Sequence, residues 1–217
     1  MLAKKIDKLV EKYTLLKHPF YRMWTAGTLP LEALQGYAKD YYHVVKAVPK
    51  MTASLYSDNH TPEIKMNLED EKSHVALWEQ FADGIGVSKK ELKSHKPSSK
   101  VKKAVKTMET LMENKHGAVA AMYAFEVDIP NVSKSKIDGL KKHFGIKDAE
   151  TLEYFTEHER ADVYHSMVWR NIMQNFPAKE AKQCLEDSEK CLKAQNEVLD
   201  SIYEEYVPAS LMVDCSR

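Results

Sequence analysis

The sequence predicts an all-α protein built as one helical bundle. Apolar residues recur at intervals of three and four over most of the 217 residues, and alternating strand patterns between turn residues are absent. Only 7 glycines and 8 prolines interrupt the chain. An apolar share of 43% and a charged share of 29% are ordinary for a globular protein. We expect a single domain over residues 1–207 and a flexible tail at 208–217.

Proline and glycine divide the first half of the chain into helices. In chain order, the expected helices cover about residues 2–17, 21–27, 30–56 and 61–86, with a short one from residue 88. His18-Pro19 ends the first helix, and Pro49 is expected to kink the third. Thr61, followed by proline, caps the fourth helix, and Ser88 forms a capping box with Glu91.

The second half of the chain is expected to form four more helices. They cover about residues 99–128, 133–144, 148–175 and 177–206. Pro130 closes the first of these, and Gly145 follows the second at the position where helices often take a left-handed residue. No linker, repeat or low-complexity stretch separates the helices, so a single bundle is the simplest architecture.

Charge and cysteine content narrow the class of protein. The 32 basic and 32 acidic residues balance, so we expect neither nucleic acid nor a membrane as partner, and the lysine-rich segment 89–103 is interpreted as solvated surface. The chain start lacks the apolar region of a signal peptide, and no run of eighteen apolar residues occurs, which favours a cytoplasmic protein. Cys184, Cys191 and Cys215 match no metal-binding spacing and are expected to be reduced.

Three polar residues interrupt the apolar face of the helix expected at 148–175. His158, Asp162 and His165 recur at intervals of three and four among aromatic residues, so they share that face. Burying three such groups costs several kcal/mol unless they are paired or bind a metal. A lone histidine on an apolar face is usually a satisfied core residue, and a single Asp-x-x-His pair is weak evidence for a metal site.

A second carboxylate–histidine pair strengthens the metal interpretation. Glu71 and His74 lie three residues apart on the helix expected at 61–86. Asp70 lies four residues before His74 and shares the same face, whereas Glu69 is turned away; we take Glu71 as the ligand. Di-iron and di-manganese bundles combine two such pairs with a glutamate from each of two other helices.

Glu126 is the candidate for one of those additional glutamates, because it follows a run of uncharged residues on an apolar face. Taken alone, it would be interpreted as a helix-end glutamate bonded to a neighbour. The six candidate metal ligands are Glu71, His74, Glu126, His158, Asp162 and His165. Oxygen and imidazole ligands suit iron or manganese, so we expect two iron-class ions, Fe/Fe or Fe/Mn. Their four positive charges exceed the three carboxylates, which leaves room for an anionic bridge.

Several motifs are similar to those of the heme-oxygenase-like di-iron oxidases of the TenA/PqqC superfamily. Within that group the chain resembles the CADD-like proteins, named after the Chlamydia protein associating with death domains, over most of its length. The motifs are His18–Tyr21, Tyr37–Tyr42, Ala124–Glu126 with Ile129-Pro130, and Lys136–Leu140. The most specific motif is Tyr154–His165, whereas the His-Pro-Phe start is shared with wider heme-oxygenase-like groups.

The resemblance implies a bundle of seven to eight helices with a dimetal centre that activates molecular oxygen and needs an electron donor. The implied product is para-aminobenzoate for folate biosynthesis. Tyr21 matches the tyrosine thought to supply the carbon skeleton, and Lys136 the lysine that supplies the amino group. Tyr37 is counted with them as a candidate catalytic residue. A homodimer is compatible with this resemblance, and Phe125 stands where close relatives are expected to have tyrosine.

Other functions fit the residues less well. Without the resemblance, Tyr21 would be interpreted as a packing aromatic residue and Lys136 as a solvated lysine. A thiaminase-like enzyme needs a nucleophilic cysteine near the central cavity, but the cysteines crowd the end of the chain. A heme oxygenase or a cofactor-free oxidase needs no set of carboxylates. A non-enzymatic protein that binds a partner through an exposed helix face stays open as an alternative, because a fold alone does not fix function.

Overall fold

A computed structural model describes residues 2–212, and the all-α prediction is confirmed for this part of the chain. No β-strand occurs among the described residues. The helices are α1 (Leu2–Tyr13), α2 (Pro19–Ala26), α3 (Leu31–Asp58), α4 (Pro62–Gly84), α5 (Lys89–Ser94), α6 (Ser99–Leu111), α7 (Lys115–Glu126), α8 (Ile129–His143), α9 (Ala149–Met173) and α10 (Ala181–Tyr206). Short 3-10 turns are η1 (Leu15–Lys17), η2 (Ala178–Glu180) and η3 (Ala209–Leu211).

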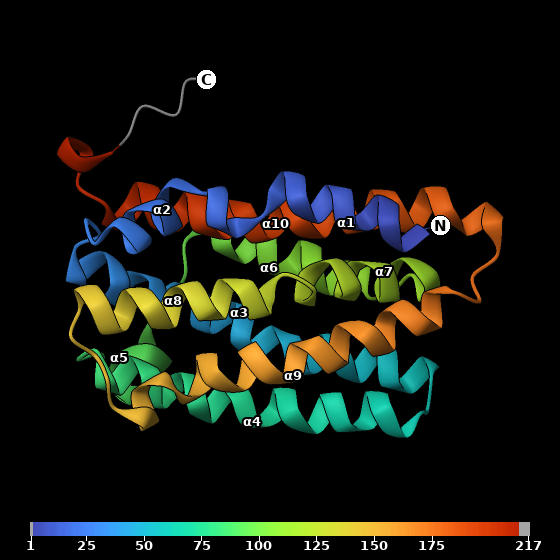
Figure 1. The fold of residues 1–217 in the computed structure, drawn as a ribbon, viewed down its shortest axis with the longest axis horizontal. Helices are drawn as coiled ribbons and strands as arrows, with labels where there is room; N and C mark the ends of the chain where they lie inside the picture. Colours follow the sequence, from blue (N-terminus) through green and yellow to red (C-terminus); the bar gives the residue numbers. More distant parts are fainter. Residues whose placement is uncertain (1, 213–217) are drawn as a thin grey trace.

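The long helices lie roughly along one common axis (Figure 1). In that view α1, α2 and α10 form the upper side and α4 and α9 the lower side, with α3, α7 and α8 between them. Helix α3 packs against α4 and α10, and α9 packs against α4, α7 and α8. The interior between α3, α4, α7, α8 and α9 is therefore enclosed by helices on every side.

The expected helix at 99–128 is wrong, because α6 ends at Leu111 and α7 begins at Lys115. A tertiary contact explains the break. The Asn114 side chain donates a hydrogen bond of 2.8 Å to Asp187 Oδ2 on α10, and a Cβ at Gly117 would overlap the same carboxylate. Asparagine favours helix starts over helix interiors, because its side chain competes for hydrogen bonds.

Prolines mark other helix boundaries that differ from the sequence prediction. Pro130 lies in the first turn of α8 rather than closing a helix, since proline at that position needs no backbone N–H. Helix α3 continues through Pro49 to Asp58. At the end of the chain, η3 occupies part of the tail expected at 208–217, and residues 213–217 lie outside the described residues.

Three buried tryptophans connect the helices that surround the core. The indole N–H of Trp24 on α2 donates to the Lys136 carbonyl on α8 at 3.3 Å. Trp78 on α4 donates to the Ala38 carbonyl on α3 at 2.8 Å. Trp169 on α9 donates to Glu126 Oε2 on α7 at 2.5 Å. Each indole combines a large apolar contact with a satisfied donor, which fixes the relative position of two helices.

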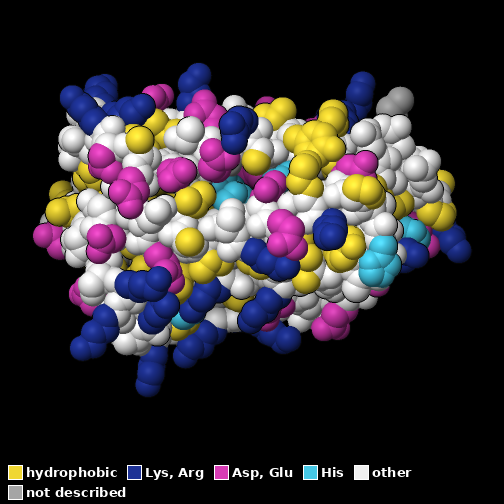
Figure 2. Space-filling view, turned by 90° about the horizontal axis from the view of Figure 1, so that it is seen from below, with side chains coloured by type: hydrophobic (Ala, Val, Ile, Leu, Met, Phe, Trp, Pro, Cys, Tyr) yellow, Lys and Arg dark blue, Asp and Glu magenta, His cyan; other side chains and the backbone are white. Residues whose placement is uncertain are grey.

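The two described cysteines are reduced and the surface charge is mixed, as the sequence predicts. Cys184 and Cys191 on α10 are buried free thiols, and Cys215 lies outside the described residues. Basic and acidic side chains are interspersed over the face shown in Figure 2. No helix within residues 2–212 is long and apolar enough to cross a membrane.

We predict that Gly139→Ala destabilises the bundle. The added Cβ would overlap the Trp24 indole and come within 3.3 Å of the Trp24 carbonyl, so α2 would have to move away from α8. Overpacking costs about 1–3 kcal/mol, part of which the better helix propensity of alanine offsets. Chemical denaturation should give a lower free energy of unfolding, whereas Lys142→Ala on the exposed side of α8 should leave it nearly unchanged. Equal stability of both variants would contradict the close α2–α8 contact.

Candidate active site

Helices α4, α7 and α9 bring the six predicted metal ligands together in the interior. Glu71 and His74 come from α4, Glu126 from the last turn of α7, and the remaining three from α9. Intervals of three and four residues place the α9 side chains on one face, as the sequence predicts. Every one of the six residues is at most 6% exposed.

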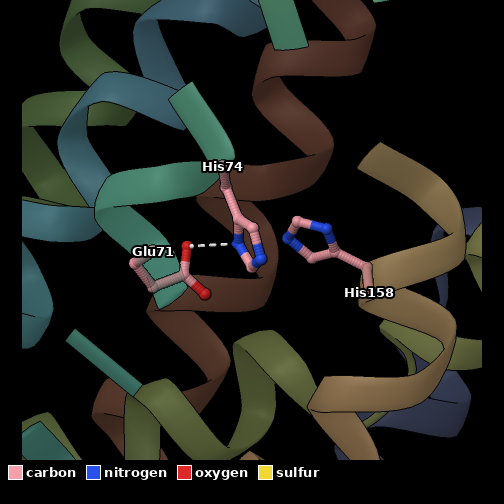
Figure 3. A group of neighbouring side chains, drawn as sticks. All are labelled: Glu71, His74 and His158. Carbon is pink, nitrogen blue, oxygen red and sulfur yellow. Dashed lines mark ion pairs between the residues drawn. The ribbon is translucent and has the colours of Figure 1, made fainter. Parts of the chain in front are cut away.

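Five of the six residues have donor atoms that form two groups sharing Glu71, and Asp162 belongs to neither group. The first group contains Glu71, His74 and His158, and the second contains Glu71, Glu126 and His165. Within each group the donor atoms lie within 4.8 Å of one another. Figure 3 shows the first group, in which His74 and His158 face each other across α4 and α9 with ring centroids 4.1 Å apart. Glu71 Oε2 lies 3.3 Å from His74 Nδ1.

Asp162 and Asp70 contact opposite nitrogens of His165. Asp162 Oδ1 lies 3.1 Å from His165 Nδ1, whereas Asp70 Oδ2 lies 3.1 Å from Nε2. The Asp70 side chain is 42% exposed, and Asp162 is fully enclosed. Glu71 therefore faces the interior groups, and Asp70 lies on the outer side of His165. An outer carboxylate of this kind orients a ligating imidazole.

Further hydrogen bonds hold the candidate ligands in one orientation. His158 Nδ1 lies 2.7 Å from the Tyr154 carbonyl, so it carries the proton and leaves Nε2 as the acceptor nitrogen. Trp169 donates to Glu126 Oε2 at 2.5 Å. Trp169 was not identified from the sequence as the partner of Glu126. Its spacing of four residues from His165 is the signal that could have suggested it.

The site has more acceptors than the protein can satisfy, which fits a bound cation. Glu126 Oε1 and Asp162 Oδ2 are buried without a hydrogen-bond partner among the described residues. Burial, together with the neighbouring Asp162 charge, raises the pKa of Glu126 well above its ordinary value. Burial, with the Glu71 charge, does the same for the pKa of Asp162. Divalent ions would stabilise both carboxylates in the charged form.

The imidazole of His158 is neutral in this environment. Burial, followed by repulsion from His74, lowers the pKa of His158 to about 3. A neutral imidazole is the form that binds a metal ion. Oxygen and nitrogen donors without thiolate suit iron or manganese among the transition metals. The donor set and the unpartnered carboxylate oxygens therefore fit the expected dimetal centre.

Tyr21, Tyr37 and Lys136 form a second buried cluster beside these groups. The Lys136 ammonium donates to the Tyr37 hydroxyl at 2.9 Å, and the Tyr37 and Tyr21 hydroxyls are 3.1 Å apart. The Lys136 Nζ lies 5.1 Å from the centre of the Tyr21 ring. The three residues come from α3, α2 and α8 and are at most 4% exposed. The Tyr37 hydroxyl thus connects Lys136 with Tyr21 through two hydrogen bonds.

Burial changes the acid–base properties of this cluster. It lowers the pKa of Lys136 to about 7, because no carboxylate compensates the ammonium charge. It raises the pKa of both Tyr21 and Tyr37 well above the ordinary value, so both phenols stay protonated. Near neutral pH, Lys136 is therefore present in both its charged form and its neutral, nucleophilic form.

A small cavity joins the two clusters. About 20 Å³ of space lies among side chains of α3, α4, α7, α8 and α9, room for roughly one water molecule. Its lining includes Glu71, Glu126, His158, Asp162 and Lys136. Tyr41, Phe125 and Tyr154 also line it. Tyr21 lies one layer farther from the cavity, behind Tyr37 and Lys136.

Tyr41 and Tyr154 are residues that sequence reasoning did not select. Both were present within the motifs, but nothing in the spacing distinguished them from packing aromatics. The cavity lining includes three phenylalanine and tyrosine side chains. Phe125 carries no hydroxyl, and the phenol groups in the lining belong to Tyr41 and Tyr154. Ring contacts run from Tyr154 to Trp78 at 4.7 Å and from Trp78 to Tyr37 at 5.5 Å. Aromatic rings therefore fill the space between the candidate ligands and the Tyr21 cluster.

Comparison with known proteins gives consistent matches over nearly the whole chain. The model of the TENA/THI-4/PQQC family matches residues 3–206. A 4-aminobenzoate synthase of Chlamydia muridarum is 39% identical over 209 residues, which cover 92% of this chain and 86% of that protein. A 4-aminobenzoate synthase of Nitrosomonas europaea is 32% identical over 94% of this chain and 91% of its own.

A solved structure confirms the predicted heme-oxygenase-like fold. It is a domain of unknown function with a heme oxygenase-like fold from Shewanella denitrificans. It superposes with a TM-score of 0.80 and covers 94% of this chain and 91% of its own. The sequence identity is 16%, so this likeness concerns the fold alone.

The lowered pKa of Lys136 predicts a specific dependence of stability on pH. Between about 7 and the ordinary lysine value of 10.5, the folded protein binds fewer protons than the unfolded chain, so wild-type stability should rise with pH. Replacing Lys136 with methionine removes the pH-dependent contribution of this lysine to the free energy of unfolding. The stability advantage of Lys136→Met over wild type should therefore shrink by a few kcal/mol, in order of magnitude, from pH 7 to pH 10.

Chemical denaturation of both proteins at several pH values measures this difference. Lys134→Met, on an exposed position of the same helix, is the matched control and should show little dependence on pH. A constant difference between Lys136→Met and wild type across the whole range would contradict a depressed lysine pKa.

Proposed function

The chain belongs to the TENA/THI-4/PQQC family, and we propose that it is an oxygen-dependent 4-aminobenzoate synthase with a dimetal centre. The relatives that bear this name support the product, and the buried carboxylate–histidine groups support the metal centre. One observation carries the proposal furthest. The hydrogen-bond chain from Lys136 through Tyr37 to Tyr21 lies directly beside groups that can hold metal ions.

Six residues would hold two iron-class ions in this proposal. Glu71 belongs to both groups, so it is the residue best placed to serve two ions. The set is Glu71, His74, Glu126, His158, Asp162 and His165. When bound, the metal pair would supply electron transfer to and from molecular oxygen, with an external electron donor as reductant.

The protein's own side chains match the structure of the product. In 4-aminobenzoate, an amino group and a carboxylate occupy opposite positions of one benzene ring. Tyr21 carries its hydroxyl and its Cβ at those two positions, so it supplies the ring and the carboxyl carbon. Lys136 supplies the nitrogen, and its Nζ already lies 5.1 Å from the centre of that ring. This proximity replaces the binding of a free aromatic substrate.

Tyr37 holds both reacting side chains and provides a path for protons. Its hydroxyl accepts from Lys136 and can exchange a hydrogen bond with Tyr21. Deprotonation gives Lys136 the lone pair that forms a carbon–nitrogen bond in place of the Tyr21 ring–oxygen bond, and a pKa of about 7 makes this form accessible. Release of the product also breaks the Tyr21 Cα–Cβ bond and the Lys136 Cε–Nζ bond, with molecular oxygen as the oxidant of Cβ. The aromatic side chains around Tyr21 exclude water, which protects an oxidised phenol from quenching.

Metal analysis of two neighbouring carboxylates tests the centre. We predict that wild type binds up to two iron or manganese ions per chain, that Glu71→Gln loses both, and that Asp70→Asn keeps two. Glu71 belongs to both groups, whereas Asp70 only orients His165, and losing an outer partner weakens metal affinity by about 10–100-fold without removing a ligand. Elemental analysis after loading at saturating metal gives the stoichiometry.

A double variant adds a stronger test of the same centre. His158→Ala/His165→Ala should retain only traces of metal, and His60→Ala/His116→Ala, whose histidines lie outside the groups, should load like wild type. Added metal should also raise the melting temperature of wild type, because it binds only the folded state. Identical metal content in wild type and in His158→Ala/His165→Ala would rule out the site.

Peptide mass spectrometry tests the source of the product. Incubation with iron or manganese, a reductant and oxygen should release about one 4-aminobenzoate per chain, together with loss of side-chain mass at Tyr21. Tyr21→Phe and Lys136→Arg should give no product above background, because phenylalanine lacks the phenol that is oxidised and arginine lacks the primary amine that donates the nitrogen.

Two outcomes would count against self-consumption. Continued release of 4-aminobenzoate by Tyr21→Phe would show that the ring comes from elsewhere. Many turnovers per chain would show that a free small molecule is the substrate. Tyr56→Phe, which alters a partly buried tyrosine outside the cluster, serves as the control and should behave like wild type.

A further inference from the structure

A lysine-lined groove lies on the side of α3 that faces away from the candidate active site. Its volume is about 460 Å³, far larger than the internal cavity and within the size range of ligand sites. It is formed by α3, α6 and the segment before α6. Its lining residues are His43, Lys46, Ala47, Lys50, Pro97, Lys102, Val105, Lys106 and Glu109.

The groove brings four lysines together on one concave surface. Lys46 and Lys50 are four residues apart on α3, and Lys102 and Lys106 are four residues apart on α6. Like charges at this spacing repel each other. Glu109 is the one carboxylate in the lining, and none of the four lysines forms an ion pair within residues 2–212.

Some surface lysines of the same region are paired with carboxylates, whereas Lys90, Lys96 and Lys103 form no ion pair within the described residues. Lys89 and Lys93 both contact Glu79, and Lys100 contacts Glu204. What distinguishes the four groove lysines is that they line one concave surface. Burial and the neighbouring Lys50 lower the pKa of Lys46, and the Glu79 charge opposes this shift in part.

The floor of the groove differs from its rim. Ala47, Pro97 and Val105 give it an apolar base. The His43 ring lies there too, 6.0 Å from the His95 ring, and its buried Nε2 has no hydrogen-bond partner in the described part of the chain. A cationic rim above an apolar floor suits a small molecule with strong negative charge at one end better than it suits a flat protein surface.

From this arrangement we propose that the groove between α3 and α6 binds a small molecule through a chain of two or more phosphate groups. Lysines act as point-charge donors to phosphate oxygens, and two facing pairs can contact successive phosphates. The site is separate from the candidate metal centre. On α3, Tyr41, Val44 and Val45 face the internal cavity, whereas Lys46 and Lys50 face the groove, so one helix separates the two.

Isothermal titration calorimetry tests the proposal, with ATP and inorganic tripolyphosphate as the two probes. Wild type should bind at least one of these probes, and binding should weaken as salt increases. Lys46→Gln/Lys102→Gln removes one charge from each side of the groove and should weaken binding by at least about tenfold. Lys65→Gln/Lys141→Gln removes the same net charge from exposed positions elsewhere and should change binding by less than about twofold.

The two probes identify the source of the phosphates. Tighter binding of ATP would indicate an organic ligand whose ring occupies the apolar floor, and equal binding would indicate recognition of the polyphosphate chain itself. Both results support the site. A melting temperature of Lys46→Gln/Lys102→Gln at or above that of wild type would also support it, because removing repulsion should not destabilise the fold.

Three results would overturn the proposal. The first is no detectable binding of either probe at low salt. The second is equal weakening in both double variants, which would show that only the overall charge matters. The third is tighter binding of a short single-stranded oligonucleotide than of either probe, which would make nucleic acid the occupant.

Discussion

The burial of carboxylates and imidazoles among packed helices is the constraint on which the rest of this structure depends. Charged groups enter such an interior only if other groups compensate them. Here some partners come from the same helix, such as Asp162 for His165, and others from a neighbouring helix, such as Asp70 for His165 and Trp169 for Glu126. The relative positions of α4, α7 and α9 are therefore determined by polar contacts as well as by apolar packing.

The same enclosure produces the unusual chemistry of the lysine–tyrosine cluster. A lysine at the surface would stay charged at neutral pH, but Lys136 is surrounded by aromatic rings and is paired with no carboxylate among residues 2–212. Its ammonium is stabilised by the Tyr37 hydroxyl and by the ring faces alone. A hydrophobic environment thus makes one cation reactive, while a few ångströms away an acidic environment suits divalent metals. The boundary between them is formed by Tyr37, Tyr41 and Trp78.

The sequence predicted the side chains of the carboxylate–histidine groups better than it predicted the helix boundaries. The α9 residues recur at helical spacing, so their shared face followed from periodicity alone. The break between α6 and α7 did not, because it depends on a contact between Asn114 and Asp187, 73 residues apart. The choice between Asp70 and Glu71 also needed the structure, since both fit one helix face and only the position of α9 separates their roles. The selection of Tyr21 and Lys136 depended on the resemblance to a known family. Their closeness arises from the packing of α2 on α8, which no local sequence pattern reveals.

The location of Tyr21 has a structural consequence for a protein that consumes its own side chain. Tyr21 does not line the cavity that contains the candidate metal ligands, and Tyr37 and Lys136 stand between them. Loss of its ring would leave a void against Phe20, Trp24 and Tyr37, at a cost of several kcal/mol to the core. The indole contacts that hold α4 to α3 and α9 to α7 involve other residues, so the helices that carry the carboxylates and histidines would keep their positions. In the proposed reaction, the separation of Tyr21 from the candidate metal ligands would therefore confine the damage of one turnover to the α2 side of the bundle.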